Sequence, residues 1–252
     1  MLCHFLKCLI WTTFSFFYVG FVHSQETGTL KVRFVYGGDV PDEELIQVNK
    51  NVGFCGQFRH KNERLLIDKE TKAIQNVLLY VHTGRGGSKL EPVQRKPKIV
   101  TLSTINCRFE PHLLSMRAGD TLDLVNRDPI GHNTNINFFA NPAIAGNRRL
   151  VEKAEPVPIL VECNIHPWMR AYLIVLDHPY VDVSDEQGNI EIKDLPVGGE
   201  LVFRLFHEAA SGPIRMLEVD GKSLALERNM LRLKIEPGLN DLGTVVFPAS
   251  TF

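Results

Sequence analysis

The chain has 252 residues, of which 44% are hydrophobic and 23% are charged, a composition typical of one large globular domain or two small ones. Its 28 basic and 29 acidic residues leave a formal charge of −1. This balance creates no overall positive field, so we expect neither a nucleic-acid partner nor attraction to an anionic membrane surface.

The first residues have the pattern of a secretory signal peptide. Residues 1–7 contain one lysine and no acid, residues 8–21 are almost wholly apolar, and Ser24 precedes a plausible cleavage point at Gln25. The apolar run is shorter than the roughly 20 residues that span a bilayer. We therefore predict cleavage of residues 1–24, a periplasmic or secreted location, and no stable membrane span afterwards.

Short apolar segments separated by turn residues follow along the chain. Apolar and polar residues alternate over 30–36, which ends at Gly37, and a short apolar run occupies 77–81. Neither run is long enough for a confident helix, and the pattern indicates an all-β sandwich or barrel. The predicted strands are 30–36, 77–81, 99–105, 113–116, 121–125, 135–139, 158–162, 172–176, 180–184, 189–193, 200–207, 231–235 and 243–247.

Export leaves an odd number of cysteines. Cys3 and Cys8 depart with the signal peptide, so the mature chain keeps Cys55, Cys107 and Cys163 in an oxidising compartment. One of these thiols must therefore have another role.

One seven-residue segment concentrates potential metal ligands. Cys163-Asn164-Ile165-His166-Pro167-Trp168-Met169 places a thiol, an imidazole and a thioether at C-x2-H-x2-M spacing directly after a predicted strand. A thiolate, two imidazoles and a distant methionine sulfur suit copper in both oxidation states, so electron gain or loss needs little rearrangement. The second imidazole must come from elsewhere, and His132 offers it about thirty residues upstream at the end of a predicted strand.

Together, residues 118–133 and 163–170 resemble the cupredoxins, the small blue copper proteins, and among them amicyanin and its plastocyanin-like relatives. The similarity covers roughly residues 99–176. It implies a Greek-key β-sandwich that holds one type 1 copper ion. The implied ligands are His132, Cys163, His166 and Met169.

The resemblance also implies roles for residues around the ligands. It implies that Asn133 hydrogen-bonds across to the cysteine loop, and that the ring edge of His166 reaches solvent as the port for electrons. Ile165 departs from amicyanin, which has proline there, and adds a backbone N–H able to reach the thiolate and tune the redox potential. The residues expected to surround the ligands are Asn133, Asn164, Ile165, Pro167 and Trp168.

The remaining segments suggest further β modules. We divide the chain into the signal peptide at 1–24, a β elaboration packed on the copper domain at 25–98, the cupredoxin domain at 99–176 and a C-terminal β module at 177–252. The stretch from His178 to His207 resembles a carboxypeptidase regulatory-like β module, and such modules are usually binding or spacer domains.

A second segment imitates a copper loop. Cys107, His112 and Met116 have C-x4-H-x3-M spacing, but they precede a predicted strand that the copper domain still needs, whereas the cysteine loop of a cupredoxin comes last. We therefore favour a disulfide between Cys107 and Cys55, with a second, adventitious metal site at Cys107 and His112 as the alternative. Four other histidines lack partners at metal spacing and are expected at the surface or at strand edges: His60, His82, His178 and His207.

These observations predict an exported protein that transfers single electrons by Cu(I)/Cu(II) cycling, with a dehydrogenase or cytochrome as redox partner. The alternatives are copper storage or delivery, and an accessory subunit of the methylamine-utilisation type. The sequence contains no His-x-His pair, on which multicopper oxidases depend, so we expect no enzymatic activity.

Overall fold

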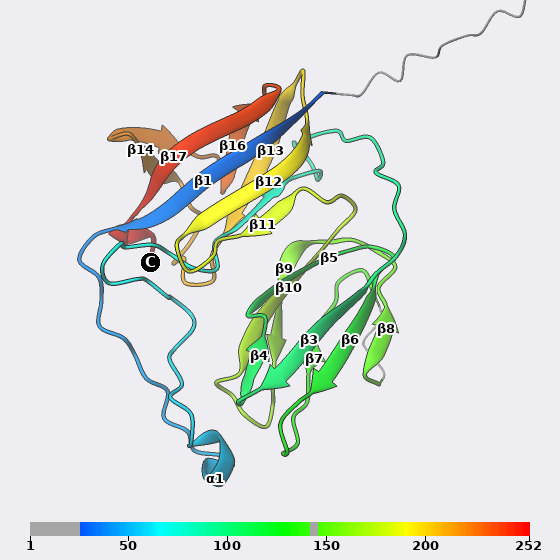
Figure 1. Cartoon of the computed structure of the whole chain (residues 1–252), viewed down its shortest axis with the longest axis vertical. Helices are drawn as coiled ribbons and strands as arrows, with labels where there is room; N and C mark the ends of the chain where they lie inside the picture. The colour runs from blue at the N-terminus through cyan, green and yellow to red at the C-terminus, as the bar shows by residue number, and fades with distance from the viewer. Residues whose placement is uncertain (1–25, 142–145) are drawn as a thin grey trace, which may run out of the picture.

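The computed structural model describes residues 26–141 and 146–252, and nearly all regular elements within them are β-strands. The strands form two β-sandwiches that lie end to end along the longest axis (Figure 1). The prediction of an all-β sandwich fold with further strands at both ends is confirmed. The predicted signal peptide lies outside the described residues. Within the described ranges, no helix is both long and apolar enough to cross a membrane.

The lower sandwich in Figure 1, which we call the central sandwich, is built from β3 to β10. Its two sheets enclose one apolar core, to which Leu102, Leu122 and Leu173 contribute fully buried side chains. One sheet has the order β5 (Leu113–Arg117), β10 (Arg170–Leu176), β9 (Glu155–Glu162) and β7 (Asn135–Ile136); the other has the order β4 (Arg108–Glu110), β3 (Ile99–Ile105), β6 (Thr121–Asn126) and β8 (Arg148–Leu150).

The upper sandwich, which we call the terminal sandwich, combines strands from both ends of the described chain. In β1, Leu30, Val32 and Phe34 point into its core, as the alternation in the sequence predicts. One sheet has the order β12 (Asn189–Pro196), β1 (Thr27–Gly37), β17 (Gly238–Pro248), β14 (Met216–Val219) and β15 (Lys222–Ala225); the other has the order β11 (Val181–Val183), β2 (Leu78–Val81), β13 (Glu200–Phe206) and β16 (Met230–Lys234). A short 3-10 helix, Ala249–Thr251, follows β17.

The strands of residues 25–98 pair within the terminal sandwich: β1 pairs with β12 and β17, and β2 pairs with β11 and β13. We predicted that residues 25–98 pack on the copper domain, and one face of β2 contacts the central sandwich. The period of a strand identifies its buried face but not the strand beside it, so the sequence pattern could not distinguish the two partners.

Strand β2 joins the two sandwiches because both of its faces are buried. Leu79 and Val81 belong to the core of the terminal sandwich. Leu78 and Tyr80 point the other way and pack with residues of β5 and β10, namely Leu113, Ile174 and Leu176. A strand buried on both faces reads as a continuous apolar run, which explains why residues 77–81 lack alternation.

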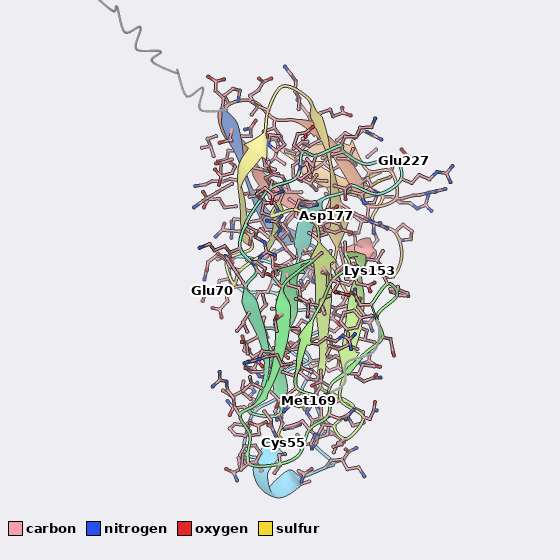
Figure 2. All side chains as sticks on the ribbon, turned by 90° about the vertical axis from the view of Figure 1, so that its right-hand side faces the viewer. Cys55, Glu70, Lys153, Met169, Asp177 and Glu227 are labelled. Carbon is pink, nitrogen blue, oxygen red and sulfur yellow. A yellow bond between two sulfur atoms is a disulfide. The ribbon has the colours of Figure 1, made fainter. Side chains whose placement is uncertain are left out.

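Residues 38–77, between β1 and β2, form an extended segment that we call the arm. It runs down to the far end of the central sandwich and carries the short helix α1 (Val52–Cys55), where Cys55 lies at the same end of the molecule as Met169 (Figure 2). Cys55 forms a disulfide with Cys107 of the central sandwich. The arm therefore covers one end of the central sandwich, although its flanking strands belong to the other sandwich.

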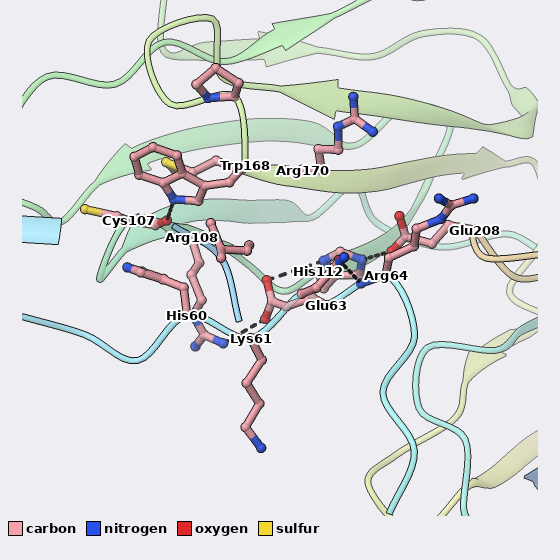
Figure 3. A pocket seen from close by; sticks show the side chains of 14 residues that line it. His60, Lys61, Glu63, Arg64, Cys107, Arg108, His112, Trp168, Arg170 and Glu208 are labelled. Atoms are coloured by element: carbon pink, nitrogen blue, oxygen red, sulfur yellow. Dashed lines mark hydrogen bonds and ion pairs between the residues drawn. The ribbon is translucent and has the colours of Figure 1, made fainter. Parts of the chain in front are cut away.

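A histidine between two carboxylates also connects the arm to both sandwiches. Nε2 of His112, just before β5, hydrogen-bonds Glu208, which follows β13, and Nδ1 lies 3.7 Å from a carboxylate oxygen of Glu63 in the arm (Figure 3). Arg108 donates to the other Glu63 oxygen at 2.7 Å. Burial lowers the pKa of His112, but the hydrogen bond to Glu208 and the negative charges of Glu208 and Glu63 outweigh this effect and raise it to about 9.

This contact predicts a loss of stability at alkaline pH. Because the folded protein raises the pKa of His112, its contribution is complete below the pKa of unfolded histidine, about 6.5, and is lost as the pH rises through about 9. We expect the free energy of unfolding, measured by urea titration, to fall by up to about 3 kcal/mol across this range. His112→Gln should remove most of this slope, and an equal slope in the variant would contradict the assignment.

A second prediction concerns the turn before β12. Gly188 has φ +79°, and a Cβ there would lie 2.3 Å from the carbonyl oxygen of Phe34, whereas Gly198 has φ +88° with no atom within 4 Å of a Cβ. Gly188→Ala should therefore lower the free energy of unfolding clearly more than Gly198→Ala, which adds only the backbone strain of about 1 kcal/mol. Thermal unfolding of both variants measures the difference, and equal losses would show that the close approach to Phe34 is wrong.

Candidate metal centre

The loop between β9 and β10 brings a thiol and a thioether together. The Cys163 N–H donates to the Met169 carbonyl at 3.2 Å, and the Met169 N–H donates to the His166 carbonyl at 2.9 Å. These hydrogen bonds fold the loop back on itself at the entry to β10. Cys163 and Met169 are each 1% exposed and belong to the core of the central sandwich.

Three donor atoms converge at the end of this sandwich. One ring nitrogen from each of His132 and His166 and the Cys163 sulfur all lie within 4.8 Å of one another. The Cys163 sulfur is 3.7 Å from His166 Nδ1, and the centroids of the two imidazole rings are 4.7 Å apart. Metal bonds of roughly 2.0 to 2.3 Å place two donors of one ion about 3.5 Å apart, so this spacing fits a single ion.

The imidazole of His132 is oriented by a carboxylate. Its Nε2 lies 2.9 Å from Asp128 Oδ2, and both side chains are almost completely buried, with 1% and 2% of their surface exposed. Because an ionised carboxylate only accepts hydrogen bonds, Nε2 is the donor, and in the neutral imidazole Nδ1 keeps a free lone pair. Asp128 also accepts the backbone N–H groups of Asn106 and Cys107, at 2.6 and 2.9 Å, which fixes its own position.

The imidazole of His166 is oriented by the arm. Its Nε2 donates to Asn51 Oδ1 at 2.8 Å, and Asn51 directly precedes α1 in a left-handed conformation with φ 45°. In the neutral imidazole, Nδ1 of His166 therefore keeps the lone pair that could bind a metal. Burial, and secondarily the nearby His132, lower the pKa of His166, which favours the neutral imidazole that can bind a metal.

The prediction that the ring edge of His166 reaches solvent is wrong. The residue is 0% exposed, because Asn51 covers Nε2 and the Trp168 ring packs with its centroid 5.2 Å from that of the imidazole. The arm, which this resemblance does not include, occupies the place where solvent or a partner was expected.

The residues around the donors take the following positions. Asn133 Oδ1 accepts the Asn164 N–H at 2.9 Å and lies 3.5 Å from the Cys163 sulfur, so it links the two ligand-bearing segments. Ile165 is 43% exposed, and within the described residues its N–H makes no hydrogen bond to the sulfur. Pro167 is exposed, while Trp168 is half-buried and donates its indole N–H to the Cys107 carbonyl at 3.2 Å.

The donor chemistry fits a soft or borderline metal ion. Within the described residues, His132 Nδ1 is a buried nitrogen with no hydrogen-bond partner, and Cys163 is the free cysteine. A buried polar atom without a partner is costly, and a metal ion among these donors would remove that cost. Two imidazoles with a thiolate, and a methionine in the same core, favour copper over hard cations, which prefer oxygen.

The second cysteine-containing segment cannot form a thiolate site. Cys107 lies near Asp128 and His132, but its sulfur is bonded to Cys55. His112 is engaged by Glu63 and Glu208 instead. Four other histidines were expected at the surface or at strand edges, and the surface position is wrong, since each is at most 7% exposed: His60, His82, His178 and His207. His82 and His207 directly follow the ends of β2 and β13.

Comparisons with known proteins find similar structures but no family. No protein family and no curated protein matches the chain. An oxidised single-substitution variant of amicyanin is 21% identical with a TM-score of 0.27, over 30% of this chain and 80% of that one. Pseudoazurin from Methylobacterium extorquens AM1 is 18% identical with a TM-score of 0.27, over 32% and 76%. A copper-containing nitrite reductase from Thermus scotoductus SA-01 is 24% identical with a TM-score of 0.26, over 40% and 25%.

Likenesses at these TM-scores carry no argument about function. The structure by itself shows an all-β chain with two β-sandwiches. What the central sandwich does must therefore be argued from the residues of the site itself.

Two residues that complete the site carried little or no signal in the sequence. Asp128 precedes His132 by four residues, so a carboxylate next to a histidine in the same turn could have indicated its role. Asn51 lies 115 residues from His166 in a segment without an element pattern, and nothing in the sequence connects the two.

The tautomers provide a test that needs no metal. In the metal-free protein, we expect long-range proton–nitrogen NMR spectra to show His132 and His166 both protonated at Nε2. Asn51→Gly should release only His166 from this state, because glycine keeps the left-handed backbone while the accepting oxygen is lost. Wild-type spectra with the proton on Nδ1 of either ring would contradict the donor geometry.

Proposed function

We propose that this chain binds one type 1 copper ion through His132, Cys163, His166 and Met169. The observation that carries the proposal is the convergence of one ring nitrogen from each of His132 and His166 and one buried free thiol within 4.8 Å. His132, Cys163 and His166 would hold the ion, and Met169 at the end of the same loop would contribute a weaker sulfur ligand.

We further propose that the protein transfers single electrons. A copper ion held by these donors supplies a one-electron couple, Cu(I)/Cu(II). The chain itself supplies rigidity, since the two imidazoles are fixed by Asp128 and Asn51, and the loop is closed by its own backbone hydrogen bonds. Donors that stay in place in both oxidation states keep the rearrangement on electron transfer small. A redox protein, such as a dehydrogenase or a cytochrome, would exchange the electron, and we assign no catalysis to the chain.

The cellular setting belongs to the same proposal. The apolar leader at residues 1–24 and the disulfide between Cys55 and Cys107 both favour export to a periplasmic or extracellular space, where disulfides persist. The resemblance of His178 to His207 to a carboxypeptidase regulatory-like module is still a prediction. This stretch contributes β11, β12 and β13 to the terminal sandwich, and we propose a spacer or docking role for it.

Copper storage or delivery is the second candidate, and the covered imidazole favours it. His166 is completely buried and hydrogen-bonded to the arm, so a partner has no direct access to a ligand edge. A protein that holds copper without exchanging electrons would keep a colourless Cu(I) form and show slow electrochemistry. An electron carrier would show fast, reversible electrochemistry at an electrode.

The decisive test is the visible spectrum after addition of Cu(II). The chain from Gln25 onward should develop an intense blue band from thiolate-to-copper charge transfer, with one copper bound per chain. Cys163→Ser should lose this band, because a hydroxyl cannot supply the charge transfer. Met116→Leu, in the second cysteine-containing segment, is the matched control and should keep it. Identical spectra for wild type and Cys163→Ser would show that the thiol is not a ligand.

A further inference from the structure

The arm closes the direct route to the metal centre. Asn51 covers Nε2 of His166, and the disulfide at Cys55 holds the arm against the central sandwich. A partner that approached this end of the molecule would meet α1, where Val52 is 58% exposed, and not a ligand ring. If electrons are exchanged here, another group must lie between the copper ligands and the surface.

Trp168 occupies such a position. Its ring centroid is 5.2 Å from that of His166, and the residue lines a hollow of about 260 Å³ together with Met169 and Pro167. The hydrogen bond from the indole N–H to the Cys107 carbonyl, at 3.2 Å, holds the ring in place. His60 flanks it, with ring centroids 6.3 Å apart. The indole is therefore a fixed aromatic group that contacts a ligand ring and also lines an accessible hollow.

The hollow carries an excess of positive charge. Lys61, Arg64, Arg108 and Arg170 line it, against the carboxylates Glu63 and Glu208 (Figure 3). Both carboxylates are already engaged by His112, which is positively charged at neutral pH. Within the described residues, the exposed Arg64 forms no ion pair. The other three basic side chains are also paired with carboxylates outside the hollow, Lys61 with Glu43, Arg108 with Glu110 and Arg170 with Glu162. Among the described lining residues, Arg64 therefore carries the unpaired positive charge beside the loop.

We propose that electrons enter and leave through Trp168, and that the hollow beside it docks the acidic face of a redox protein. This inference rests on the proposed function. Each transfer moves one electron between the bound copper and the cofactor of the partner, with no bond made or broken and no proton moved. The indole is not itself oxidised. Complementary charge steers such a partner and raises the rate of association.

The docking part can be tested on the metal-free protein with an inert anion. Hexacyanochromate(III), which is paramagnetic, should broaden the Trp168 indole N–H and the amide signals around Arg64 in NMR spectra. Arg64→Glu should weaken this broadening about tenfold or more at low ionic strength, because a repulsive charge replaces an attractive one. Arg215→Glu, an exposed arginine of the terminal sandwich, is the matched control and should leave it unchanged. Broadening that is equal in both variants, or that is centred on Val52, overturns the docking site.

The electron route is tested on the copper-loaded protein by stopped-flow oxidation. Arg64→Glu should slow oxidation by hexacyanoferrate(III) and accelerate oxidation by the cationic tris(phenanthroline)cobalt(III), while Arg215→Glu changes neither rate. Trp168→Leu should slow oxidation by both reagents about tenfold or more, because no aromatic ring then lies next to the His166 ring. Trp168→Phe, which restores an aromatic ring, should recover part of the rate.

The outcomes separate this inference from the proposal on which it rests. Wild-type protein without a blue band refutes the proposed function itself. A blue band in the Trp168 variants with rates equal to wild type refutes the route, and a rate that responds instead to Val52→Glu places the exchange at the arm.

Discussion

The site depends on two hydrogen bonds that leave a nitrogen free. Asp128 and Asn51 each accept a hydrogen bond from Nε2 of one imidazole, which leaves Nδ1 of His166 at 3.7 Å from the Cys163 sulfur and Nδ1 of His132 buried without a described partner. If either ring were held in the other tautomer, an N–H would point at the thiol and the three atoms could not share one ion. Metal binding at this centre therefore depends on the tautomers of His132 and His166.

The larger structure keeps these two hydrogen bonds in place. Asp128 is fixed by backbone N–H groups next to Cys107, and Cys107 is bonded to Cys55, which lies four residues after Asn51. One small region therefore positions both oxygen acceptors. The strands on either side of the arm, β1 and β2, belong to the terminal sandwich. The terminal sandwich therefore helps to hold the arm over the end of the central sandwich. This gives a physical reason for the two sandwiches to be joined firmly, through the buried faces of β2 and the contacts of His112.

The sequence was most informative where the determining contacts are local. The loop from Cys163 to Met169 carries its ligands within seven residues, and the structure brings three of the four proposed ligands within 4.8 Å. The hairpin of β14 and β15 was not predicted, although Asp220 and Gly221 at its turn both have positive φ and form a strong local hairpin signal. The three-residue strands β4 and β8 offer too few positions for alternation to be recognised.

Long-range pairing set the limits of the sequence analysis. The pattern of β1 identified its inward face, but it could not indicate that its neighbours are β12 and β17 near the other end of the chain. For the same reason, the burial of His166 under Asn51 could not be expected, since it depends on how the arm returns across the fold. Histidines such as His60 carry polar atoms that suggest exposure, yet its Nε2 bonds the Cys55 carbonyl at 3.0 Å inside the arm.

X-ray absorption at the copper K edge tests the central claim most directly, because it reports the atoms bonded to the ion and requires no partner. We expect one short copper–sulfur bond and two imidazole nitrogens in the first coordination shell of the loaded protein, and nearly the same pattern in the Cu(I) and Cu(II) forms. A shell of nitrogen and oxygen atoms alone, without the short sulfur bond, would contradict this expectation.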